Sequence, residues 1–525
     1  MTRQDHQVDL TLAGSRPAGI ARELLGAGAD VHRFQDRPVL LTGEVATLRT
    51  VNGRSCLLHG LRLLACMMRD LTVAVPAETG DLITAVREEA ARVGFGAPIT
   101  VIPVQLGEGE PNYDRYDAIL SVGRAARPEL PWTVINADGW LARVSSGSCD
   151  LPAGGDQANP MAALAAASLG VSEVFKRLLA PPGDQGVPFD GVSFNLFSYQ
   201  PGDEDSGPAI DRPIDLDILV VGAGAIGSGV VGVLRELTVT GRVEVIDRQA
   251  YADENLGTCL LVGPSDVGRA KAEVAAEQLR DAGIAATGRQ EEVSDYRQRV
   301  GMDRPAVILN GLDNVEARHE IQGLWPDLVI DGAIGPLNAQ VSRHPWDEDE
   351  DVACLRCLFQ LPVIDTTAES VRMTGLRAER VVQGDELVTE QDVVEAPEER
   401  REYLRQRLGK QICSIIPSEE IVRLSGGEEE VGFAPSAPFV ACLSASMVVG
   451  ELVKHALGLA PAEPLEPRYQ IDMLIGPDAG QPLPMGRRAD CTCVTRRTNI
   501  ETLRRRTRER AAPREPLPAS DRIGR

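Results

Sequence analysis

Apolar and polar positions alternate along this chain in two kinds of pattern, which predict a regular succession of strands and helices. Short apolar runs are typical of buried strands, and longer amphipathic stretches are typical of helices. In the N-terminal half the predicted strands are 37–41, 71–75, 99–102, 118–122 and 132–135, and the predicted helices are 57–68 and 81–93. Strands that alternate with helices favour an α/β fold with a mostly parallel, Rossmann-like sheet.

The same order of elements recurs in the second half of the chain. Three pairs of segments match in order: 116–123 with 305–313, 132–145 with 327–342, and 159–178 with 437–457. In the last pair, Pro160, Glu173 and Lys176 fall opposite Pro438, Glu451 and Lys454. Chance likeness between two alanine-rich helices would explain that pair alone, but three ordered matches indicate an internal duplication.

The duplication divides the chain into two pseudo-repeated halves. The expected ranges are a degenerate Rossmann-like copy at 14–196, a Pro- and acid-rich linker at 197–213, a nucleotide-binding half at 214–493 with an insertion at 361–433, and a basic tail at 494–525. We expect the insertion to be a solvated helical crossover. The tail is expected to be disordered, with a docking arm for an acidic partner as the alternative.

The motif around which the second half is built is DILVVGAGAIG, residues 217–227. An apolar strand leads into Gly222, Gly224 and Gly227, which have the spacing G-x-G-x-x-G and precede a predicted helix. The next strand, 242–247, ends in Asp247, where such folds hydrogen-bond a ribose hydroxyl. These features indicate a nucleotide site. A glycine-rich turn without a ligand is the simpler alternative.

Composition excludes several classes of protein. Of the 525 residues 43% are hydrophobic, so the chain can bury a sizeable core. A net charge of −23 argues against a nucleic-acid-binding body, which needs clustered Lys and Arg. The N-terminus lacks the apolar core of a signal peptide, and Glu451 and Lys454 interrupt the longest apolar helix, so we expect no membrane span and a cytoplasmic location. Ten cysteines are then expected to be reduced.

Three polar residues follow the glycine motif at positions that favour chemistry on a nucleotide triphosphate. Lys271 begins a predicted helix, Asn255 lies in YADENLG, and Asp313 follows the next strand. In an adenylating enzyme, Lys271 would neutralise phosphate charge, Asn255 would donate to phosphate, and Asp313 would hold Mg²⁺. A dehydrogenase has no need of this lysine and aspartate. Each residue alone also has a plain interpretation: a solvated lysine, or a helix cap.

Two close pairs of cysteines form a candidate metal site. Cys354 and Cys357 occur as C-L-R-C, and Cys491 and Cys493 occur as C-T-C. Four thiolates suit a closed, tetrahedral Zn²⁺ site of structural type. The second pair is tighter than the usual C-x-x-C, so unpaired buried thiols are the alternative.

Taken together, these motifs resemble the ThiF/MoeB/HesA family of adenylyltransferases, which shares its catalytic fold with ubiquitin-activating enzymes. The resemblance covers residues 214–493 and rests on these sequences: GAGAIG, Asp247, ENL, Lys271, LDN-x-x-x-R, VIDGAIG, C-x-x-C, FAPSAPFVA and the late cysteine pair. The family's pairing of an active with an inactive copy would explain the N-terminal half. It implies a monomer with a pseudo-dimeric core, or a homodimer.

The resemblance also implies a reaction and a set of ligands. Such enzymes use ATP and Mg²⁺ to adenylate the C-terminal carboxylate of a ubiquitin-like protein, a sulfur-carrier protein or a peptide, and many then form a thioester. ATP would be bound by Gly222, Gly224, Gly227, Asp247, Asn255 and Lys271, with Mg²⁺ at Asp313. Zn²⁺ would be bound by Cys354, Cys357, Cys491 and Cys493.

Two positions depart from the family pattern. The family usually reads N-L-x-R-Q, whereas this chain has Thr258 and Cys259 in place of the Arg and Gln. An arginine from the N-terminal half could supply the missing charge, and the candidates are Arg16, Arg22, Arg33 and Arg37. The usual acidic residue two positions after Asp247 is replaced by Gln249.

Two questions stay open at the level of the sequence. If a thioester forms, Cys413 in the insertion is the expected acceptor, because Lys410 lies nearby; a half-buried cysteine in the run ICSII is the alternative. Besides an adenylyltransferase, the chain could be a non-catalytic subunit that presents a peptide to another enzyme. An NAD-dependent oxidoreductase is the third candidate.

Overall fold

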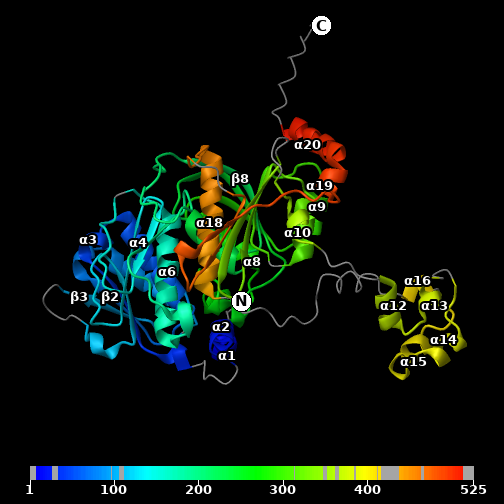
Figure 1. Ribbon diagram of the computed structural model, residues 1–525, viewed down its shortest axis with the longest axis horizontal. Coiled ribbons are helices and arrows are strands. Elements are labelled where there is room, and N and C mark those ends of the chain that lie inside the picture. Colours follow the sequence, from blue (N-terminus) through cyan, green and yellow to red (C-terminus); the bar gives the residue numbers. More distant parts are fainter. Residues whose placement is uncertain are drawn as a thin grey trace, which may run out of the picture. The chain divides into compact units, whose positions relative to one another are not determined.

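The computed structural model describes the chain in two compact units (Figure 1). Its described residues are 8–26, 33–95, 97–105, 111–155, 157–312, 314–346, 352–360, 366–382, 386–410, 412–415, 437–462 and 466–511. The first unit comprises Met1–Asp313, Glu320–Leu358 and Pro435–Arg525, and the second comprises Asn314–His319 and Phe359–Ala434. Both halves of the sequence repeat therefore fold into the first unit.

The N-terminal half of the first unit forms a seven-stranded sheet with the order β3-β2-β1-β4-β5-β6-β7. The first five strands of the chain pair in parallel, and the last two pair antiparallel. The strands are β1 (Val39–Gly43), β2 (Leu71–Pro76), β3 (Thr100–Val104), β4 (Ala118–Val122), β5 (Trp132–Asp138), β6 (Leu141–Ser145) and β7 (Val192–Asn195). All five strands predicted from the apolar runs are present.

The C-terminal half forms an eight-stranded sheet with the order β10-β9-β8-β11-β12-β13-β14-β15. Here too five strands pair in parallel before the antiparallel ones follow. The strands are β8 (Ile214–Val221), β9 (Val239–Ile246), β10 (Ala285–Arg289), β11 (Val307–Asn310), β12 (Leu328–Ile334), β13 (Asn338–Pro345), β14 (Arg468–Asp472) and β15 (Gln481–Leu483). Seven strands repeat the N-terminal order one for one, which confirms the duplicated, mostly parallel α/β fold.

The strands of the first unit are accompanied by helices. They are α1 (Leu10–Ala13), α2 (Ser15–Leu25), α3 (Val45–Leu48), α4 (Val51–Ala65), α5 (Leu82–Arg92), α6 (Pro160–Leu179), α7 (Ala225–Leu234), α8 (Lys271–Asp281), α9 (Val293–Val300), α10 (Val315–Gln322, which begins in the second unit), α11 (Leu355–Leu358), α18 (Pro438–Leu457), α19 (Thr492–Thr495) and α20 (Arg497–Ala511). The matched helices α6 and α18 lie side by side between the sheets (Figure 1).

The two central helices connect the halves through equivalent buried lysines, each paired with a glutamate of its own helix. Lys176 pairs with Glu173 on α6, and Lys454 pairs with Glu451 on α18. Lys176 Nζ also donates to the carbonyl of Leu474, 3.2 Å away in the C-terminal half, and Lys454 Nζ donates to that of Leu196, 3.2 Å away in the N-terminal half. These crossed contacts explain why both helices carry glutamate and lysine at equivalent positions. Among the described helices, α18 alone is long and apolar enough to cross a membrane, and it is mostly buried in this core.

The N-terminal half has a carboxylate where the C-terminal half has its glycine loop. Glu44 follows β1, the counterpart of β8, and its Oε1 accepts from the backbone N–H groups of Arg124 and Ala125 at 3.0 and 2.8 Å. A Cβ on Gly123 would lie 2.5 Å from Glu44 Cδ, so the side chain fills the turn. The negative charge of Glu44 disfavours a phosphate there, which agrees with the absence of a phosphate loop in this half.

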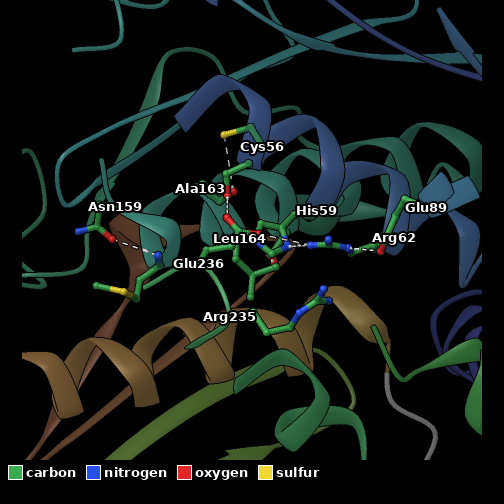
Figure 2. A network of polar contacts seen from close by, with 12 residues as sticks. Cys56, His59, Arg62, Glu89, Asn159, Ala163, Leu164, Arg235 and Glu236 are labelled. Atoms are coloured by element: carbon green, nitrogen blue, oxygen red, sulfur yellow. Dashed lines mark hydrogen bonds and ion pairs between the residues drawn. The ribbon is translucent and has the colours of Figure 1, made fainter. Parts of the chain in front are cut away.

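A buried polar network crosses the contact between the halves (Figure 2). His59 Nε2 on α4 lies 3.2 Å from Glu236 Oε1, which follows α7, and Ser55 Oγ donates to Glu236 Oε2 at 2.5 Å. Arg62 joins Glu236 to Glu89. Burial alone would raise the pKa of Glu236, but His59, Arg62 and the hydrogen bond from Ser55 outweigh it and hold that pKa at about 2. The network therefore stabilises the fold only while Glu236 is ionised.

Glu236→Gln is expected to lower the free energy of unfolding near pH 7 by about 1–3 kcal/mol, because Arg62 and His59 lose a charged partner. The folded-state pKa of Glu236 is depressed, so its contribution is complete above the ordinary value of 4.5 and is lost as pH falls towards about 2. The difference between wild type and variant in denaturant titrations should shrink over that range. A difference that stays constant down to pH 2 would contradict this account.

The second unit is a small helical body with a core of its own. Its helices are α12 (Thr366–Thr374), α13 (Ala378–Val382), α14 (Glu390–Glu395), α15 (Glu398–Arg405) and α16 (Ile412–Ile415). Its buried side chains are Leu376, Val388, Val393, Ala396, Leu404, Ile412 and Ile415. The described part of the insertion is therefore helical, as expected, but it folds around an apolar centre.

The tail differs from the expected disorder over residues 494–511. Helix α20 packs on the rest of the first unit: Ile500 is buried, and Arg504 Nη1 donates to the carbonyl of Trp325 at 2.9 Å. Arg504 also pairs with Asp327. The high arginine content of the tail predicted a disordered, solvated segment. The few apolar positions at helical spacing in it are too weak a pattern to predict a packed helix. Residues 512–525 lie outside the described part of the chain.

Candidate functional site

The glycine motif forms the turn between β8 and α7, and each glycine meets a different demand. Gly222 has φ +89°, a conformation that favours glycine. A Cβ on Gly227 would lie 2.0 Å from the carbonyl oxygen of Gly222, so only glycine lets the helix approach the turn. A Cβ on Gly224 would meet nothing within 4 Å. The open side of the turn is therefore at Gly224, the residue just before the helix, where an anion is favoured.

Substituting alanine at these glycines should separate folding from ligand binding. Gly227→Ala is expected to cost about 3 kcal/mol of stability, since the turn must move to admit the methyl group. Gly224→Ala should lower the unfolding temperature less than Gly227→Ala, because a Cβ there meets nothing within 4 Å, while weakening ATP binding measured by calorimetry. Equal stability of the two variants would show that the packing at Gly227 does not restrain the turn.

Asp247, which follows β9, holds the turn in place. Its Oδ2 accepts from Ala223 N at 2.8 Å, and its Oδ1 accepts from Gln249 N at 2.8 Å. Tyr251 reaches the same turn, because its hydroxyl donates to the carbonyl of Ala223 at 2.9 Å. The carboxylate thus braces the loop, a role that the sequence did not suggest. Contact with a ribose stays a prediction for Asp247.

Lys271 is buried at the start of α8, with 5% of its surface exposed, so the interpretation as a solvated helix lysine is wrong. Its Nζ donates to Gln249 Oε1 at 2.7 Å, and its backbone N–H donates to the Gln249 carbonyl at 3.0 Å. The departure at Gln249 has a clear consequence: a neutral amide orients the positively charged ammonium group, and no carboxylate among the described residues forms an ion pair with it. That charge remains for an anionic ligand.

Asn255 lies in the 3₁₀ turn Asp253–Gly257 and is almost fully buried. Its Oδ1 accepts from Ala252 N at 2.9 Å, which fixes the side chain. This turn packs against the N-terminal segment: a Cβ on Gly257 would lie 2.2 Å from the carbonyl oxygen of Ala13. The N-terminal half therefore forms one wall beside Asn255.

The structure distinguishes among the four arginine candidates. Burial raises the pKa of the Cys259 thiol, and the positive charges of Lys271 and Arg16 oppose that rise, so both cations lie near Cys259. Arg37, by contrast, pairs with Asp117 at 2.8 Å, and Arg22 is exposed on α2. Arg33 is exposed in the short 3₁₀ helix Arg33–Asp36 and is not among the charges that act on Cys259. Arg16 is thus the candidate associated with the position where the family's arginine is missing.

Asp313 lies outside the described residues. The strand that leads to Asp313 is described. Asn310 ends β11, and its amide donates to the buried carboxylate of Asp331 on β12. Leu312 N in turn donates to Asn310 Oδ1 at 3.2 Å. These bonds shape the strand end that leads to Asp313. Sequence reasoning missed Asn310 and Asp331, since neither residue type stands out beside a motif.

The four cysteines of the predicted metal site meet in space. Their Sγ atoms all lie within 4.8 Å of one another, and all four residues are buried. The Sγ–Sγ distances are 3.8 Å for Cys354 and Cys357, 3.7 Å for Cys354 and Cys491, and 3.5 Å for Cys357 and Cys493. Tetrahedral Zn²⁺ with bonds of about 2.3 Å would set its sulfurs roughly 3.8 Å apart. The donor set and its spacing fit that ion.

Cys413 lies in α16, but its side chain is outside the described residues. The nine cysteines with described side chains are all free thiols, and Cys149 alone among them is exposed. A hydrogen bond to Asp190 and the charge of that residue raise the pKa of the Cys149 thiol, which disfavours the reactive thiolate. The choice of Cys413 as thioester acceptor therefore stays a prediction.

Comparison with known proteins gives a family match over this region. The ThiF family model matches residues 211–493. An uncharacterized protein, y4jF, of Sinorhizobium fredii (strain NBRC 101917 / NGR234) is 26% identical over 397 residues, or 71% of this chain and 75% of that relative. The likeness to y4jF is long enough to reach into both halves.

Two further similarities are shorter or more distant. The NEDD8-activating enzyme E1 catalytic subunit of Caenorhabditis elegans is 38% identical over 122 residues, which are 22% of this chain and 27% of that relative. The chain thus spans little more than a quarter of that subunit. Among solved structures, the crystal structure of E. coli MccB with MccA-N7isoASN is 17% identical, covers 53% of this chain and 66% of that chain, and has a TM-score of 0.33.

Proposed function

Because the chain belongs to the ThiF family, we propose that it adenylates a C-terminal carboxylate with ATP. The substrate class is a ubiquitin-like protein, a sulfur-carrier protein or a peptide. A relative named for activating NEDD8 supports a protein or peptide substrate. The match covers only part of that relative, so the activities of the whole relative are not carried over to this chain.

One observation carries the proposal: the buried Lys271 is held by a neutral partner beside a glycine turn that is open at Gly224. A buried ammonium group is costly unless a negative charge meets it. Within a chain of net charge −23, a preserved positive charge at a helix start favours a polyphosphate. A nicotinamide cofactor would not need it, which argues against the oxidoreductase.

The proposed roles follow from position. The turn at Gly222 and Gly224 would receive phosphates on its backbone N–H groups, while Lys271 and Asn255 neutralise and orient them. A carboxylate oxygen of the substrate attacks the α-phosphorus, the bond to the β-phosphate bridging oxygen breaks, and pyrophosphate leaves. Asp313 would hold Mg²⁺, which screens phosphate charge when bound. A following thioester on Cys413 would release AMP.

We assign the missing arginine to Arg16. Its charge reaches the neighbourhood of Cys259 from the N-terminal half, so the inactive copy would complete the active one. Arg16→Ala is expected to raise the KM for ATP. It should also lower the exchange of labelled pyrophosphate into ATP about tenfold to a hundredfold, because one charge-assisted contact is lost. Arg22→Ala, on the same helix but exposed, is the matched control and should match wild type. Equal loss in both variants would point to disturbance of α2 instead.

We propose further that the cysteine cluster holds structural Zn²⁺, since four buried thiols at tetrahedral spacing leave no open position for substrate. The two halves lie in one chain, so we expect a monomer with a pseudo-dimeric core. A homodimer is the alternative, and a measurement of the molecular mass in solution distinguishes the two. We place the protein in the cytoplasm, where its ten cysteines stay reduced.

Exchange of labelled pyrophosphate into ATP tests the proposal. Candidate peptides or carrier proteins should support exchange when their C-terminal carboxylate is free, and lose it when that carboxylate is amidated. Binding of the same candidates without any exchange would favour the alternative, a non-catalytic subunit that presents a peptide to another enzyme. Exchange that ignores the amidation would contradict a role for the C-terminus.

A further inference from the structure

A cavity of about 260 Å³ opens beside the cysteine cluster, where α9, α11, α19 and α20 meet. Three arginines line it: Arg297, Arg356 and Arg496. Trp325 and Ile500 supply apolar surface, and no acidic side chain occurs among the lining residues described. A second cavity of about 590 Å³ shares Arg297 and adds Arg304 together with one acidic residue, Glu320. Neither cavity shares a lining residue with the glycine turn.

The arginines converge because the backbone makes room for them. Arg356 Nη2 and Arg297 Nη1 would lie 3.3 and 3.5 Å from a Cβ on Gly323, so both guanidinium groups lie against this glycine. Burial, and then the charge of Arg297, lower the pKa of Arg304, which shows that like charges face one another. Converging cations of this kind are stabilised by an anionic ligand.

The turn that carries Trp325 is held in an unusual conformation. Trp325 has φ +51°, which a bulky residue seldom adopts. Arg504 of α20 donates to the carbonyl of Trp325 at 2.9 Å and so fixes the turn. The same helix exposes Arg505 and Arg506 to solvent. The arginine-lined cavity and the arginine-rich helix α20, in which Arg505 pairs with Glu509 at 3.9 Å, together form a basic corner in a chain whose net charge is −23.

We propose that this cavity is a docking site for an acidic polypeptide segment of a partner. Carboxylates of the segment would pair with Arg297, Arg356 and Arg496, and an adjacent apolar side chain would pack against Trp325. A nucleic acid carries phosphate charge along its whole length and would extend from the basic corner onto the acidic body. A short acidic segment meets only the arginines.

Fluorescence anisotropy of a labelled peptide of glutamates with one central leucine tests this site on the full chain. Wild type should bind it, with affinity falling as salt rises, and should not bind the same peptide made with glutamine. The double variant Arg297→Ala, Arg496→Ala should lose about tenfold or more in affinity, because charge-assisted contacts are removed at exposed positions that folding does not need. Arg505→Ala, outside the cavity lining, should change affinity less than threefold, roughly the effect of one distant surface charge.

Other outcomes overturn the proposal. Equal affinity of wild type and the double variant would place the peptide elsewhere. Equal or tighter binding of a short single-stranded DNA would assign the corner to nucleic acid. The chain has an acidic run of its own at 347–351. If the peptide binds only after these residues are replaced by Asn and Gln, the chain's own acidic run, and not a partner, occupies the cavity.

Discussion

Replacing Cys354 by serine is expected to release bound Zn²⁺ and to lower the thermal unfolding midpoint more than any other single change considered for this protein. Thiolate–zinc free energy in such sites is of order 10 kcal/mol and contributes directly to folding. The cluster also joins distant segments, since Cys354 precedes α11 and Cys357 lies within it, while Cys491 caps α19 and Cys493 lies within it. Loss of the ion would free α19 from α11 within the first unit.

The measurement pairs metal content with differential scanning calorimetry on protein purified without chelator. Cys149→Ser is the matched control, because Cys149 is exposed and lies outside the cluster. It should keep both the metal and the unfolding midpoint. Wild-type protein that contains no zinc, yet unfolds at the same temperature before and after chelation, would rule out a structural metal.

The second large effect is expected at the nucleotide turn. Lys271→Ala should reduce pyrophosphate exchange by about a hundredfold to a thousandfold, because a preorganised charge that stabilises the reacting phosphate is removed. Asp313→Ala should abolish exchange and leave the unfolding midpoint nearly unchanged. Arg280→Ala is the control for α8, since this exposed residue lies in the last turn of the same helix. Exchange that survives in both Lys271→Ala and Asp313→Ala would remove these residues from the chemistry.

The sequence predicted those features that depend on local pattern. Apolar runs marked the parallel strands, and the spacing of Gly222, Gly224 and Gly227 marked the turn. The matched glutamate and lysine of α6 and α18 indicated the duplication, which the equivalent strand orders confirm. In each case a few neighbouring residues determine the structure, so one sequence is enough to reveal it.

Features that depend on distant contacts could not be predicted. Nothing in the sequence links Arg16 to Cys259, because their approach depends on how the N-terminal segment packs against the turn at Asp253–Gly257. The bracing of the glycine turn by Tyr251 needs a fold to be seen. The order of α20 was missed for a similar reason: Arg504 is buried only because the carbonyl of Trp325 lies within its reach.

Following the label from ATP carrying a radioactive α-phosphorus tests the central claim most directly. With a carrier or peptide that supports exchange, the account predicts label in a substrate–AMP adduct and in AMP, together with unlabelled pyrophosphate. The adduct should be absent in Asp313→Ala and when the substrate's C-terminus is amidated. Release of labelled ADP, or adduct formation that does not need the free carboxylate, would contradict adenylation by this chain.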